Sequence, residues 1–264
     1  MDQDLLISQY HRVLSKINVE QYKFENDKYS GVFLPVAFDA YNDSKPKIMV
    51  IGRETAGWNT NNDKNTIKRI INKKEDGLLS DIIEESIKRY SWHLKTKPDG
   101  ELKTKHRSHF QRYYYRVSKE LGLSPDGMIY ANLFAWDYDK KSPLNRPKEE
   151  LSNITNLSLE LLSIQIKFFK PDYIIFATGY RCIDPIIKIM FKEHFEEHDT
   201  VSVVPKKLWE FRAANATCFR IAHPRAQNGH ANFRDEVIDR IRNYSQNKSH
   251  TLNSTSLKEP AVLE

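Results

Sequence analysis

The sequence predicts one α/β domain in which a central sheet of four mostly parallel strands lies between two layers of helices. Short apolar runs bounded by turn residues, of which residues 48–51 are the clearest, have the length and composition of buried parallel strands. Segments with apolar residues at helical spacing alternate with these runs, an order typical of α/β folds. A chain of 264 residues is long enough to bury such a core without disulfide bonds.

The elements of this domain follow from the apolar pattern. The expected strands are residues 48–51, 128–133, 173–177 and 218–222. The expected helices are residues 5–17, 110–121, 147–168, 181–191 and 233–244. A short hairpin, residues 201–204 and 208–211, is expected beside the fourth strand. The domain covers residues 1–246, and residues 247–264 are polar without periodicity, which predicts a disordered tail.

Composition excludes several classes of protein. The two cysteines, Cys182 and Cys218, are too few for a disulfide framework, a four-cysteine zinc site or an iron–sulfur cluster. No apolar run is long enough to span a membrane, and the N-terminus is acidic where a signal peptide is basic. We therefore expect a cytoplasmic protein without membrane association, without an obligate protein partner, and without a metal or nucleotide cofactor.

Positive charge is concentrated in one segment, residues 88–116. It holds nine basic and two acidic residues, so its net charge of +7 exceeds the +6 of the whole chain. Tryptophan and tyrosine residues lie between the basic ones, a mixture that suits phosphate contacts and base stacking. A solvated loop followed by a helix with a charged outer face is the alternative. The lysines and arginine expected to contact DNA are Lys95, Lys103, Lys105 and Arg107.

Polar side chains follow three of the four expected strands. Glu54 comes shortly after the first strand, Asn132 ends the second, and His223 follows the fourth. In an open parallel sheet these positions share one edge, where ligands bind. We expect Glu54 to activate a water or stabilise positive charge on a sugar, and Asn132 to read the edge of a base. His223 is expected to donate a hydrogen bond to an oxyanion that grows on a leaving base.

Each of these residues alone has a structural alternative. Glu54 would complement a helix dipole, Asn132 would tie down a loop, and His223 followed by Pro224 would end a strand. Their joint placement favours a site. Neighbouring side chains are expected to bind the substrate, the tryptophans by stacking on a base turned out of the duplex: Arg53, Gly57, Trp58, Trp136, Arg225 and Gln227. Arg225 and Asn228 are also expected to contact DNA.

The order and spacing of these motifs resemble the uracil-DNA glycosylase superfamily. Gly52-Arg53-Glu54 stands where that family has a motif after its first strand, Asn132 where an asparagine closes the second strand, and His223-Pro224-Arg225 where a His-Pro motif follows the last strand. The resemblance implies a four-stranded parallel sheet and a base-excising hydrolase. It also implies the three roles already given, and a loop over residues 225–232 that enters the duplex.

The sequence departs from the family where an aromatic side chain excludes 5-substituted pyrimidines. Ala56 and Gly57 occupy that region, and small residues there leave room beside the base unless Trp58 fills it. We therefore hypothesise a substrate bulkier than uracil, such as a 5-modified cytosine of phage DNA. Such a role would resemble that of bacterial defence glycosylases acting against viruses.

Two other functions remain open at this point. The alternatives are a nucleic-acid-binding module without catalysis and a metal-dependent nuclease centred on Asp137 and Asp139. A further motif points to a metal site: residues 194–198 match the His-x-x-Glu-His motif of zinc proteases. It lies at the end of an expected helix, and we interpret it as a solvated terminus.

Overall fold

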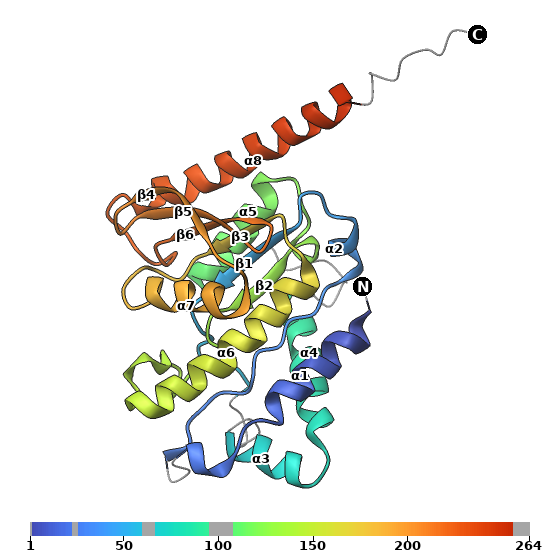
Figure 1. Cartoon of the computed structure of the whole chain (residues 1–264), viewed down its shortest axis with the longest axis vertical. Coiled ribbons are helices and arrows are strands. Elements are labelled where there is room, and N and C mark those ends of the chain that lie inside the picture. The colour runs from blue at the N-terminus through green and yellow to red at the C-terminus, as the bar shows by residue number, and fades with distance from the viewer. Residues whose placement is uncertain (1, 23–25, 60–66, 95–107, 256–264) are drawn as a thin grey trace, which may run out of the picture.

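The computed structural model (Figure 1) describes residues 2–22, 26–59, 67–94 and 108–255, with side chains to residue 247. The helices of these residues are α1 (Gln3–Leu14), α2 (Asp39–Asp43), α3 (Ile67–Glu75), α4 (Leu79–Leu94), α5 (His109–Glu120), α6 (Lys148–Phe169), α7 (Asp184–His194) and α8 (His230–Thr255). Three short 3-10 turns are η1 (Val19–Gln21), η4 (Pro125–Gly127) and η5 (Pro143–Asn145). The strands are β1 (Ile48–Gly52), β2 (Ile129–Asn132), β3 (Tyr173–Phe176), β4 (Asp199–Val204), β5 (Leu208–Ala213) and β6 (Ala216–Ile221).

The six strands form one mixed sheet in the order β2-β1-β3-β6-β5-β4. The four expected strands, now β2, β1, β3 and β6, pair with one another in parallel. The expected hairpin is present as β4 and β5, and it continues the sheet through antiparallel pairing with β6. The α/β class is therefore confirmed. The expected number of four strands was wrong, because the hairpin joins the same sheet.

Helices cover both faces of the sheet. In Figure 1, α6 and α7 lie in front of the strands and α5 passes behind them. Helix α8 runs along the top of the view, above β4 and β5. Every residue of β1, β2 and β3 is buried. This double burial explains why these strands read as continuous apolar runs rather than as alternating ones. Among the described residues no helix is both long and apolar enough to cross a membrane.

The two edges of the sheet differ. At the β2 edge, the backbone N–H of Tyr130 donates to the hydroxyl of Tyr90 on α4 at 3.2 Å, so α4 covers this edge. At the other edge, β4 is mostly exposed, and its pairing with β5 shifts register between Thr200 and Ser202. The bulge and the exposed side chains mark β4 as an open edge strand.

The C-terminal helix is longer than the apolar pattern predicts. We expected it to end near Tyr244 and a disordered tail to begin at residue 247, but α8 continues to Thr255. Arg240 of α8 forms ion pairs with Glu210 of β5 and with Glu236, and the Tyr244 hydroxyl donates to Glu210 at 3.0 Å. These contacts attach the helix to the sheet. Residues 256–264 of the expected tail lie outside the described residues.

The parallel strands β1 and β2 end side by side, with Gly52 paired to Asn132. A methyl group on Gly52 would lie 2.5 Å from Asn132 Oδ1 and 3.2 Å from a ring carbon of Phe110 on α5. Glycine is therefore required by the close approach of these two side chains.

Replacing this glycine should destabilise the fold. We expect Gly52→Ala to lower the free energy of unfolding by about 1–3 kcal/mol, because the added methyl overpacks a closed site. Urea denaturation followed by circular dichroism measures the change. Asn132→Ala removes the nearer clash, so the cost of Gly52→Ala should be smaller in that background. An equal cost in both backgrounds would contradict this explanation.

Candidate functional site

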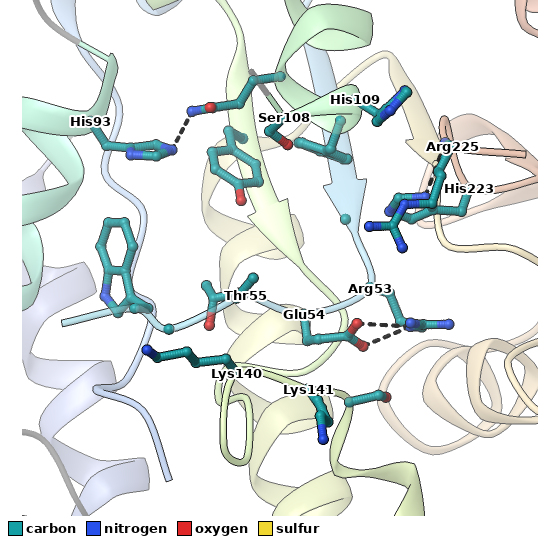
Figure 2. A pocket seen from close by; sticks show the side chains of 18 of the residues that line it. Arg53, Glu54, Thr55, His93, Ser108, His109, Lys140, Lys141, His223 and Arg225 are labelled. Atoms are coloured by element: carbon teal, nitrogen blue, oxygen red, sulfur yellow. Dashed lines mark hydrogen bonds and ion pairs between the residues drawn. The ribbon is translucent and has the colours of Figure 1, made fainter. Parts of the chain in front are cut away.

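A cleft of about 1030 Å³ opens at the carboxyl ends of β1 and β2 (Figure 2). Its walls come from five parts of the chain: the end of β1 with the loop after it (residues 52–58), the end of α4, the start of α5, the loop after β2, and the loop after β6. The carboxyl edge of a parallel sheet is where ligands bind in open α/β folds. The cleft therefore lies where the sequence predicted a site.

The lining of the cleft is strongly cationic and aromatic. Its cationic side chains are Arg53, Arg89, Lys140, Lys141 and Arg225, and the carboxylate among the described lining residues is that of Glu54. Aromatic rings complete the walls: Trp58, Trp92, Phe110 and Tyr130, with the imidazoles of His93, His109 and His223. Such a surface suits an anionic ligand that also carries flat apolar groups.

The Glu54 carboxylate is held by the preceding residue. Arg53 Nε donates to both carboxylate oxygens, at 2.7 and 3.0 Å, and Figure 2 shows the pair lying across the floor of the cleft. The Glu54 side chain is 12% exposed and that of Arg53 is 34% exposed. The ion pair fixes the direction of the carboxylate while the arginine remains open to a ligand.

His223 is surrounded by positive charge. Burial together with the nearby Arg53, Arg225, His109 and Arg234 lowers the pKa of His223 to about 4. The imidazole is consequently neutral at physiological pH. A neutral imidazole in a cationic cleft does not add to the charge that a polyanion meets, but it retains one hydrogen-bond donor.

The position of that donor follows from the backbone. The N–H of Arg225 donates to His223 Nδ1 at 3.1 Å, so Nδ1 is an acceptor. A neutral imidazole with Nδ1 as acceptor carries its proton on Nε2. His223 thus supplies an uncharged Nε2–H donor to the cleft, the group that a developing oxyanion requires.

A buried carboxylate shapes the loop that carries Glu54. Asp137 is fully buried. Its Oδ2 accepts hydrogen bonds from the Thr55 hydroxyl at 2.5 Å and from the N–H groups of Gly57 and Trp58 at 2.8 and 3.3 Å. Its Oδ1 accepts from the N–H of Lys140 at 3.0 Å. Asp137 therefore joins the loop after β1 to the loop after β2.

The two tryptophans expected to stack on a base differ in their placement. Trp58 lines the cleft, although it is only 6% exposed and its indole N–H donates to the Val32 carbonyl at 3.1 Å. Trp136 is fully buried and is absent from the cleft lining. The expectation for Trp136 was wrong, because its side chain belongs to the core.

Asn132 lies behind the wall of the cleft. The side chain is buried, does not line the cleft, and makes no hydrogen bond of normal geometry with the described residues. It lies close to Gly52 and to Tyr130. Burial raises the pKa of Tyr130 to about 12, and the nearby Asn132 amide opposes part of that rise. Direct reading of a base by Asn132 is therefore not supported by its position, because the buried side chain does not line the cleft.

The remaining predicted residues divide between the cleft and its surroundings. Arg225 lines the cleft, whereas Gln227 and Asn228 are exposed outside it. Gly57 lines the cleft, but the stem of Lys140 lies 3.1 Å from where its side chain would begin. The room expected beside Gly57 is therefore occupied by a lysine chain. Lys95, Lys103, Lys105 and Arg107 lie outside the described residues.

Several lining residues were missed as members of the site. Arg89, Trp92, His93 and His109 belong to the basic, aromatic segment that the sequence marked only by its charge, and Lys140 follows the Asp137 loop. Helical periodicity does not say which side of a helix faces a cleft. Within the part of the chain that the structure describes, no group of three or more histidine, cysteine or acidic side chains is placed to hold a metal ion.

The site thus combines an oriented carboxylate, a neutral histidine donor, cations and aromatic rings in one cleft. Comparison of the chain with protein-family models and with curated proteins finds no match.

Removing the charge of Asp137 should loosen the cleft. We expect Asp137→Asn to lower the free energy of unfolding by about 1.5–3 kcal/mol, because the new amide cannot accept all the donors that the carboxylate receives. Urea denaturation measures the loss. Asp139→Asn is the matched control, since Asp139 is an exposed carboxylate two residues away. A similar loss for both variants would contradict the structural role of Asp137.

The low pKa of His223 predicts a pH dependence of stability. Because the folded state disfavours the proton and the unfolded state takes it up near pH 6.5, the free energy of unfolding should rise between about pH 4 and pH 6.5. His223→Gln should reduce that rise. Unfolding titrations at a series of pH values compare the two slopes, and an unchanged slope would show that burial and the neighbouring cations do not lower the pKa of His223.

Proposed function

We propose that the protein is a DNA glycosylase, which hydrolyses the N-glycosidic bond of a base turned out of the duplex and leaves an abasic site. The observation that carries the proposal is the presence of the oriented Glu54 carboxylate and the neutral His223 donor in one cationic, aromatic-lined cleft. The proposal includes a uracil-DNA glycosylase-like arrangement of the parallel strands, supported by the positions of the motifs after β1 and β6.

The two groups have complementary roles in this reaction. As the bond between the sugar and the base breaks, positive charge develops on the sugar and negative charge on the base. Glu54 stabilises the positive sugar and orients the water that adds to it. The Nε2–H of His223 donates to the base oxygen that becomes negative. Water supplies the hydroxyl of the abasic sugar and the proton of the released base.

DNA as the ligand is supported by the charge of the cleft. Among the described residues that line the cleft, five carry a cationic side chain and one carries a carboxylate, which is itself paired with Arg53. Phosphates bind such surfaces by displacing counterions, which makes the binding sensitive to salt. The aromatic walls then suit the base itself, which is flat and apolar on both faces.

A 5-modified cytosine remains the proposed substrate, with uracil as the simpler alternative. The volume of the cleft supports a base larger than an unmodified pyrimidine. The ammonium groups of Lys140 and Lys141, two residues that line the cleft, supply donors for hydroxyl groups of an added substituent. Hydroxymethyl and glucosyl groups offer that chemistry.

The nuclease alternative is less well supported. Asp137, one of its two proposed carboxylates, accepts four hydrogen bonds from the chain and is fully buried. Those lone pairs are engaged in shaping the loop. The alternative of a binding module without catalysis is kept as an outcome of the following experiment.

Substitution of the two proposed catalytic residues should abolish base release. We expect Glu54→Gln to slow release by about 100- to 10,000-fold and His223→Gln by about 100- to 1,000-fold. The assay is alkali-dependent scission of end-labelled DNA that contains uracil, hydroxymethylcytosine or its glucosylated form, under single-turnover conditions. Base release leaves a strand that breaks only after alkali.

Glu149→Gln is the control, because it removes an exposed carboxylate from α6 outside the cleft. Full activity of Glu54→Gln would overturn the mechanism. Binding of DNA without base release on any substrate would favour the binding module, and strand breaks without alkali that require magnesium would favour the nuclease.

A further inference from the structure

One tryptophan differs from the others in its exposure. The chain has four tryptophans, and Trp58, Trp136 and Trp209 are at most 6% exposed. Trp92, on the last turn of α4, is 65% exposed. It is the most exposed large apolar side chain among the described residues, and it lies in the wall of the cleft.

The surroundings of Trp92 are cationic. Lys88, one helical turn earlier on α4, places its ammonium 5.2 Å from the centre of the Trp92 ring. Arg89 on the same helix lines the cleft and lies 5.2 Å from the ring centre of Trp58, so the end of α4 places one cation beside the open indole and a second cation in the cleft wall. Cations beside an exposed ring allow one ligand to place its phosphates and its base on the same surface.

The kind of nucleic acid that fits this surface follows from base stacking. A base inside a duplex is stacked on both faces, and its ring is therefore closed to an indole. A base in an unpaired strand, or next to a base that has been turned out, has a free face. Trp92 is thus suited to an unstacked base and not to an intact duplex.

We propose that Trp92 is a stacking platform for an unpaired nucleobase at the mouth of the cleft, with Lys88 and Arg89 contacting the adjoining phosphates. The proposal deepens the proposed function by naming unpaired DNA as the form that binds. It rests on that function only in taking DNA as the ligand, and not on the cleavage of any bond.

Intrinsic fluorescence tests the inference directly, because Trp92 is the exposed tryptophan of the chain. Titration with a short single-stranded oligothymidylate should quench the emission, and the blunt duplex of the same length should quench it much less. Trp209→Phe, which removes a buried tryptophan outside the cleft, should leave this quenching unchanged.

Affinity gives the second measurement. Fluorescence anisotropy of a labelled oligothymidylate should show that Trp92→Leu binds about 5- to 100-fold more weakly than the wild type. Trp92→Phe, which keeps an aromatic face, should recover most of that loss. Because Trp92 is exposed, both variants are expected to fold, and thermal unfolding verifies this.

The outcomes separate this inference from the proposed function. Unchanged affinity of Trp92→Leu, equal quenching by single strand and duplex, or no binding of oligothymidylate would each overturn the stacking role. If base release is absent from every DNA substrate while quenching and the Trp92→Leu loss are as expected, the glycosylase fails and the stacking platform stands. If base is released while Trp92→Leu binds as tightly as the wild type, the glycosylase stands and the stacking platform fails.

Discussion

The geometry of the cleft depends on the buried carboxylate of Asp137. It receives donors from Thr55, Gly57 and Trp58 on one loop and from Lys140 on another. A buried charge is tolerated only when its hydrogen bonds are satisfied, so these loops must adopt one arrangement for the fold to form. The direction of the neighbouring Glu54 is a consequence of that arrangement. The core and the site are therefore stabilised by the same side chain.

The positive charge of the cleft has two effects that act together. It attracts an anionic ligand from solution, and it holds His223 in its neutral form by lowering its pKa. A protonated His223 would add one more charge to the attraction, but its neutral form gives a donor whose proton is not lost to solvent at physiological pH. Burial is the larger cause of the low pKa of the proposed catalytic histidine, and the arginines that favour binding lower that pKa further.

The parallel strands and the edge of the sheet that carries the cleft were predictable because continuous apolar runs report burial on both faces. The placement of Glu54 and His223 followed from where those runs end. Side-chain direction was not predictable in the same way. Trp58 and Trp136 both follow strands, yet only Trp58 lines the cleft, because loop geometry set by distant hydrogen bonds decides which side chain faces inward. Asn132 ends its strand as expected, but its side chain is buried and does not line the cleft.

The open strand β4 makes the two borders of the sheet chemically unequal. On the β2 border the Tyr130 N–H is already bonded to Tyr90, whereas on the β4 border the outer backbone groups face solvent. The exposed strand β4 is consequently the more accessible border for another chain, because every residue of β2 is buried. The bulge between Thr200 and Ser202 disturbs the regular spacing that an added strand would need, and in this way it protects the protein from self-association through its sheet.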